Sequence, residues 1–127
     1  MTTINSVLIA NRGEIAERII RTVQAMNLRA IAVYSSADAE LGFVSAADQA
    51  IELGSTSQES YLNASAVIEA ALAAGADAIH PGYGFLSENA DFAAAVEQAG
   101  LIFIGPSSAV IEQMGRKDRA REIAVRA

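Results

Sequence analysis

The sequence predicts an α/β fold, a three-layer doubly wound parallel sheet of about five strands with helices on both faces. Short apolar runs rich in β-branched residues alternate along the chain with segments that have helical spacing of apolar residues. Glycines stand where two of the helical segments end. The length of 127 residues suits a single domain, and a hydrophobic content of 52% is well above that of a disordered chain.

Five short apolar runs are the predicted strands. The first, SVLIA, carries no charge, which is typical of a strand buried on both faces of a parallel sheet. The strands are expected over residues 6–10, 29–35, 49–53, 77–80 and 101–105.

The first predicted helix covers residues 14–26. Glu14–Arg18 and Glu17–Arg21 have the spacing of i,i+4 ion pairs, in the favourable order. One apolar stripe runs along this helix: Ile15, Ile19, Val23 and Met26.

Later segments are also predicted to be helical. A helix capped by Asn63 or Ser65 should end near Gly75. Residues 36–48 are expected to be irregular, with one helical turn. Three further helices are expected over residues 88–99, 107–114 and 117–126.

Composition excludes several classes of protein. The chain has no cysteine, so disulfides and thiolate metal sites are absent. A net charge of −6 does not favour nucleic-acid binding. No signal peptide or membrane-spanning run is evident, so we expect a cytoplasmic protein. All nine basic residues lie outside the stretch from Ala30 to Gly115. They are expected either to lie on solvated helix faces or to contact an anion or the acidic face of a partner.

Ligands of doubly wound sheets bind at the carboxyl ends of the strands. The loops at 11–13, 35–40, 81–87 and 105–107 should share that edge. The glycine-rich dinucleotide-binding loop is not predicted, because the turn after the first strand, ANRGEIA, has one glycine. A Walker A phosphate-binding loop is not predicted either, because the GLIFIGPS stretch lacks the required lysine.

The segment HPGYGFLSEN at 80–89 concentrates unusual chemistry in one loop. His80 is the only histidine, so we expect it to orient the loop through one hydrogen bond, with no metal site. In extended backbone Tyr83 and Phe85 would share a face, either inside the core or as an apolar wall for a planar ligand. Glu88 stands at the expected helix start, where the helix dipole stabilises a negatively charged side chain.

Lys117 follows Met-Gly-Arg near the start of the last predicted helix. A cation there is unfavourable unless an anion is near, so it either binds phosphate or lies on a solvated surface. From the residues alone the prediction stops at an α/β domain of nucleotide-binding type with a ligand edge.

Five stretches resemble one family over essentially the whole chain. They are VLIANRGEIAERIIR at 7–21, ESYLN at 59–63, GADAIHPGYGFLSENADFA at 75–93, IFIGPSS at 102–108 and MGRK at 114–117. Together they are similar to the biotin carboxylase segment of biotin-dependent carboxylases, which belong to the ATP-grasp superfamily.

The resemblance implies a Rossmann-like first domain over residues 1–115, with 116–127 beginning the connection to an ATP-grasp region. It implies carboxylation of carrier-bound biotin with MgATP and bicarbonate, so ATP, Mg²⁺ and biotin are the expected cofactors. The implied partners are a biotin carboxyl carrier domain, a carboxyltransferase component and a second copy in a homodimer. The family's catalytic and metal-binding residues lie downstream, so the segment alone is expected to be inactive.

The same resemblance assigns roles to individual residues. Lys117 corresponds to an ATP-contacting lysine, and the first helix, with Arg18 and Arg21, to the dimer contact. Tyr83, Gly84, Phe85 and Glu88 fall on the biotin side of the active site. Two alternatives are a non-catalytic homologue that pairs with a full-length subunit, and the first domain of another ATP-grasp ligase such as carbamoyl-phosphate synthetase.

Overall fold

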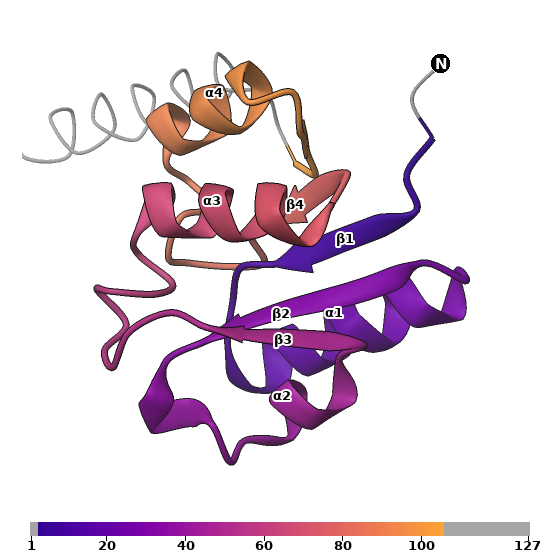
Figure 1. Cartoon of the computed structure of the whole chain (residues 1–127), viewed down its shortest axis with the longest axis vertical. Helices are drawn as coiled ribbons and strands as arrows, with labels where there is room; N and C mark the ends of the chain where they lie inside the picture. The colour runs from indigo at the N-terminus through magenta and orange to yellow at the C-terminus, as the bar shows by residue number, and fades with distance from the viewer. Residues whose placement is uncertain (1–2, 106–127) are drawn as a thin grey trace, which may run out of the picture.

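The computed structural model describes residues 3–105, which form a five-stranded sheet with helices on both faces (Figure 1). The spatial order of the strands is β3-β2-β1-β4-β5, and every neighbouring pair is parallel. The predicted doubly wound α/β sheet is therefore confirmed. The strands are β1 (Ser6–Ile9), β2 (Arg29–Tyr34), β3 (Gln49–Glu52), β4 (Ala78–His80) and β5 (Ile102–Phe103).

The helices form two layers, one on each face of the sheet (Figure 1). They are α1 (Gly13–Ala25), α2 (Gly42–Ala46), α3 (Ala64–Ala74) and α4 (Ala90–Gln98), with a short 3₁₀ turn at Ser36–Asp38. In Figure 1, α3 and α4 lie in the upper half of the view and α1 and α2 in the lower half; the two pairs pack against opposite faces of the sheet. The longest of these helices has 13 residues, and none found in residues 3–105 has the length and apolar character to cross a bilayer.

The central strand β1 shows why the chain forms this architecture. All four of its residues are buried, and successive side chains enter different cores. Leu8 belongs to the apolar cluster shared with α3 and α4, whereas Val7 and Ile9 belong to the cluster shared with α1. Side chains alternate across a strand, so an uncharged run is what a strand covered on both faces requires.

The ends of several elements differ slightly from the sequence-based expectation. Asn63 caps α3 by accepting a hydrogen bond from the Ala66 N–H at 3.1 Å, which selects one of the two predicted caps. The helix expected from residue 88 begins at Ala90, because the Asn89 side chain accepts from the Phe92 N–H at 3.0 Å. A side-chain oxygen at this position satisfies a helix N–H that has no main-chain partner.

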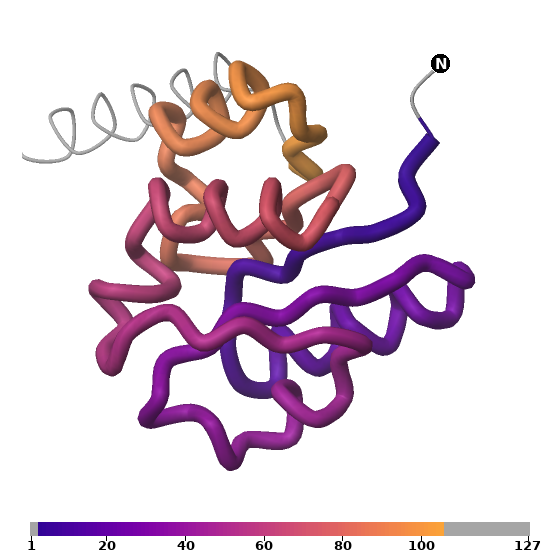
Figure 2. Tube along the Cα trace, in the orientation of Figure 1, coloured from indigo at the N-terminus to yellow at the C-terminus, as the bar shows by residue number. Residues whose placement is uncertain are grey.

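Figure 2 shows the path of the chain around the ligand edge. The carboxyl ends of β1 and β2 point to the left in this view, and the segments that follow them lie on that side, together with the stretch after β4. The predicted meeting of these loops at one edge is confirmed for the part of the chain between residues 3 and 105. The expected helices at 107–114 and 117–126, the 116–127 connection and Lys117 lie outside the described residues.

Candidate functional site

The loop after β4 is tightly curled and not extended. Gly82, Gly84 and Phe85 have positive φ angles of 69°, 67° and 48°. The backbone is therefore not extended here, which was the condition for the Tyr83 and Phe85 rings to share a face. Tyr83 is 77% exposed, whereas the Phe85 ring centroid lies 5.4 Å from that of Tyr61. Of the two rings, that of Tyr83 is the more exposed, because Phe85 is 37% exposed.

Asn11 connects this loop to the end of the central strand. Its amide nitrogen Nδ2 donates to the carbonyl oxygens of Pro81 and Tyr83, at 2.8 and 2.7 Å. Its Oδ1 accepts from the Arg12 N–H at 2.8 Å. Ile9 pairs in register with His80, so the residues just beyond both strand ends are neighbours. This role of Asn11 was not predicted; an asparagine directly after an apolar run was the available signal in the sequence.

His80 supports the same loop from below. Its Nδ1 accepts a hydrogen bond from the Gly82 N–H at 3.1 Å, as expected for a loop-orienting histidine. Burial lowers the pKa of His80, which favours the neutral ring that can accept this bond.

A second group of polar residues ties three further segments together. Arg12 makes two hydrogen bonds to Asp38, with Nε–Oδ2 and Nη2–Oδ1 distances of 2.7 and 2.8 Å. The Tyr61 hydroxyl donates to Asp38 Oδ2 at 2.7 Å and accepts from the Ser35 N–H at 3.2 Å. Neither Asp38 nor Tyr61 was predicted to be part of the site, because nothing local in the sequence indicates contacts across 23 to 26 residues.

The charges in this group are mutually stabilising. Hydrogen bonding from Arg12 lowers the pKa of Asp38, while burial opposes that shift. Burial, aided by the neighbouring carboxylate, raises the pKa of Tyr61 to about 12. At neutral pH the site therefore contains a carboxylate that accepts from both a guanidinium and a neutral phenol. Because Phe85 packs on the Tyr61 ring, this group also supports the loop after β4.

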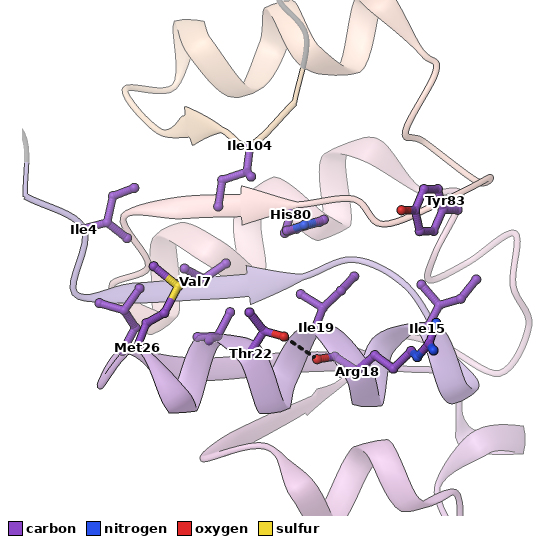
Figure 3. Close-up of a pocket in the computed structure, with 12 residues that line it drawn as sticks. Ile4, Val7, Ile15, Arg18, Ile19, Thr22, Met26, His80, Tyr83 and Ile104 are labelled. Atoms are coloured by element: carbon purple, nitrogen blue, oxygen red, sulfur yellow. Dashed lines mark hydrogen bonds between the residues drawn. The ribbon is translucent and has the colours of Figure 1, made fainter.

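An apolar groove of about 470 Å³ opens beside the loop on the α1 face (Figure 3). Ile15, Ile19 and Met26 line it from α1, and Ile104 lies on the opposite wall. Tyr83 and Ile15 both lie at the end of the groove nearest the ligand edge (Figure 3). The Tyr83 ring therefore joins two features, the curled loop and the groove.

The predicted site residues are found on two elements. Tyr83, Gly84, Phe85 and Glu88 all lie in the loop after β4. Glu88 is exposed and precedes the cap residue Asn89, so its predicted position at the helix start is wrong.

The two predicted interface arginines lie on α1. Arg18 lines the groove, and Arg21 pairs with Glu17 at 2.6 Å. The predicted Glu14–Arg18 pair is not among the ion pairs of residues 3–105.

The loop also presents main-chain donors. Within the described part of the chain, the N–H groups of Tyr83, Gly84 and Phe85 donate no hydrogen bond. A Cβ placed on Gly84 would meet nothing within 4 Å, so the space beside it is open. No cluster of three or more potential metal ligands occurs between residues 3 and 105. The arrangement suits a planar polar ligand that accepts hydrogen bonds more than it suits a metal ion.

Known proteins have sequences similar to this one. The family profile described as "Biotin carboxylase, N-terminal domain" matches residues 3–111. The chain is 58% identical to a biotin carboxylase of Halalkalibacterium halodurans, covering 91% of this chain and 26% of the relative. It is 56% identical to the biotin-dependent acyl-coenzyme A carboxylase alpha3 subunit of Mycobacterium leprae, covering 98% of this chain and 21% of that subunit.

Solved structures of biotin carboxylase domains have the same fold as this chain. The biotin carboxylase subunit of a pyruvate carboxylase matches with a TM-score of 0.89 and 49% identity, over 95% of this chain and 27% of that one. The biotin carboxylase domain dimer of Hydrogenobacter thermophilus 2-oxoglutarate carboxylase, in complex with MgADP, ADP and bicarbonate, also gives 0.89, with 44% identity over 99% of this chain and 28% of that one.

The 127 residues thus span about a quarter of the length of these relatives. The profile match covers most of the chain, and the fold agrees with it. The chain belongs to the biotin carboxylase N-terminal domain family.

Proposed function

We propose that this domain forms one wall of a biotin carboxylase active site within a longer protein, with the 81–88 loop facing biotin. The exposed Tyr83 ring on a loop at the carboxyl edge of the sheet carries this proposal. Ligands of open parallel sheets bind at that edge. The proteins that this chain resembles are named as biotin carboxylases and biotin-dependent carboxylases.

The loop residues fit the ureido ring of biotin. That ring is planar and carries one carbonyl oxygen, which can accept the N–H groups of Tyr83, Gly84 or Phe85 that have no acceptor among residues 3–105. The Tyr83 ring offers an amphipathic face beside it. The open space at Gly84 lets a ligand approach the main chain closely. In this proposal Glu88 contributes an exposed carboxylate to the rim.

The remaining chemistry belongs elsewhere in the protein. ATP and bicarbonate supply the activated carboxyl group, and a ring nitrogen of biotin receives it. In this proposal Mg²⁺ is bound by residues of the longer protein downstream of this segment. Lys117 is our proposed contact to ATP phosphate, and 116–127 the start of the connection to the ATP-grasp region. This domain contributes substrate positioning and supplies no catalytic base of its own.

The proposal also includes partners. The biotin must be delivered on a carrier domain, and a carboxyltransferase component must accept the carboxyl group. A second copy of the protein would pack against α1, where Arg18 lines the groove. Arg21, already paired with Glu17, would be part of the same surface.

Substitution of Tyr83 in the full-length protein tests the proposed loop role. Tyr83→Ala should raise the KM for free biotin about tenfold, because a loss of ~1.4 kcal/mol of contact energy corresponds to that factor. The KM for ATP should stay unchanged. Tyr83→Phe separates the contribution of the hydroxyl from that of the ring.

Leu72→Ala is a suitable control, since Leu72 is an exposed apolar residue of α3. It should leave both KM values as they are. If Tyr83→Ala changes neither KM, or changes both equally, the loop does not face biotin.

The mass of the protein that carries this sequence in its source cells should be several times 13.2 kDa, and a mass equal to 13.2 kDa would contradict a complete enzyme.

A further inference from the structure

We propose that Asn11 is the positioning residue of the 81–88 loop, clamping its main chain so that Tyr83 is presented to the ligand. Asn11 lies below the loop and is 1% exposed, so it acts on the ligand through the loop that it holds. The geometric part of this inference stands on the contacts alone. Its kinetic consequence rests on the proposed function.

The side chain of Asn11 uses both of its N–H donors and its oxygen acceptor in this position. Two N–H bonds go to the carbonyls of Pro81 and Tyr83, and the oxygen accepts the Arg12 N–H. Aspartate has the same shape but no N–H donor, and serine offers a single donor. Asparagine is therefore the small side chain that can hold both carbonyls while also satisfying the start of α1.

The loop is shaped to receive this amide. Gly82 lies so close that a Cβ on it would stand 2.6 Å from Asn11 Nδ2 and 3.0 Å from its Cγ. A real Cβ does not tolerate such distances, so any larger residue at 82 would displace the clamp. Asn11 and Gly82 thus form a complementary pair, although 70 residues separate the clamp from Pro81.

The clamp connects a glycine-containing loop to the buried central strand of the sheet. Asn11 follows β1, whose residues are all buried and whose neighbours are β2 and β4. The Ala10 N–H donates to the His80 carbonyl at 2.9 Å and holds the strand end in place. Glycine-rich loops have many accessible conformations, and fixing two carbonyls against a buried strand selects one of them.

Hydrogen exchange in the full-length protein tests the clamp directly. Exchange of peptides covering residues 81–89 should be about tenfold faster in Asn11→Ala and Asn11→Asp than in the wild type. The amides of Gly82, Ser87 and Asn89 are the reporters, because each donates a hydrogen bond within the loop region. Asn11→Ser keeps one donor and should give an intermediate rate, which preserves the test if a harsher variant fails to fold.

Asn63→Ala is the matched control. It removes another asparagine side chain that bonds to the main chain, but this residue caps α3. Loop exchange should remain at the wild-type rate in this variant. Unchanged loop exchange in a folded Asn11→Asp protein would overturn the proposal.

Kinetics then separate positioning from simple destabilisation. Asn11→Asp should raise the KM for biotin several-fold with little effect on the KM for ATP, and Asn63→Ala should not show this split. Asn11→Asp should raise the KM for biotin by a smaller factor in the Tyr83→Ala background than in the wild type, because part of the effect of the clamp is exerted through Tyr83.

The possible failures are distinguishable. If Tyr83→Ala raises the biotin KM but Asn11→Asp does not, the positioning role is wrong and the proposed function stands. If loop exchange rises in the Asn11 variants while Tyr83→Ala leaves the biotin KM unchanged, the clamp is supported and the proposed function is wrong.

Discussion

Arg12 and Asp38 form a two-point ion pair, with nitrogen–oxygen distances of 2.7 and 2.8 Å, that joins the loops after β1 and β2. Paired, parallel hydrogen bonds between a guanidinium and a carboxylate fix geometry as well as contributing energy. The Asp38 side chain is 10% exposed, whereas that of Arg12 is 43% exposed. The pair thus holds the ligand edge together while the arginine remains in contact with solvent.

Asp38→Asn should lower the free energy of unfolding of the chain by about 1–3 kcal/mol at pH 7, because charged hydrogen bonds are lost next to a buried phenol. Urea unfolding measures this difference. Glu40→Gln, at an exposed neighbouring position, should change it little. Equal stability of Asp38→Asn and the wild type would show that the ion pair contributes nothing net.

The same carboxylate predicts a dependence on acid. Its folded-state pKa lies below the ordinary value of 3.8, so its contribution to stability is complete above about pH 4. The contribution is lost as the pH falls through the folded-state pKa. The difference in unfolding free energy between wild type and Asp38→Asn should therefore shrink below pH 4, and a constant difference would contradict this assignment.

Tyr61→Phe removes the hydroxyl that bridges Asp38 and Ser35 but keeps the ring that contacts Phe85. In the wild type the pKa of Tyr61 is raised to about 12, above an ordinary value of 10. An ultraviolet titration of wild type minus variant should show phenol ionisation near pH 12. The stability from this neutral phenol should decline as the pH rises from about 10 to 12, and a midpoint near 10 would mean that the phenol is solvated.

Gly82→Ala and Gly84→Ala form a matched pair. Both glycines have φ near +70°, so alanine costs about 1–2 kcal/mol at either position for conformational reasons. Only at Gly82 would the new Cβ collide with Asn11, at 2.6 Å. We expect Gly82→Ala to lower the free energy of unfolding by clearly more than Gly84→Ala. Equal losses would mean that Asn11 moves aside at no cost.

His80 gives a readily measured pH prediction, because it is the only histidine of the chain. Its imidazole resonances should titrate below pH 6.5, since burial disfavours the charged ring. Protonation also removes the acceptor for the Gly82 N–H. The stability from the neutral ring is therefore complete above about pH 6.5 and is lost as the pH falls through the folded-state pKa. A titration at or above 6.5 would contradict the burial.

Local patterns were sufficient to predict the elements that depend on local physics. The uncharged run at β1 correctly indicated a buried strand, and the spacing over α1 correctly indicated a helix. The predicted apolar stripe is not the buried face of that helix, because Ala16, Ile20 and Val23 are its buried residues and Met26 is 64% exposed. Glu88 shows the limit of such arguments. A negatively charged residue is favoured near a helix start, but the side chain of Asn89 caps the helix instead, by accepting the Phe92 N–H.

The sequence by itself determined that this protein is a parallel α/β domain whose ligand edge includes HPGYGFLSEN, because strand and helix periodicities and turn residues act over a few positions. Only the tertiary structure decided that Asn11 holds the loop, that Phe85 turns onto Tyr61 and that Tyr83 stands free. These outcomes depend on β1 and β4 becoming neighbours and on the positive φ angles of the loop. Contacts between residues some 70 positions apart leave no local pattern, because neither end of such a contact indicates its partner in the sequence.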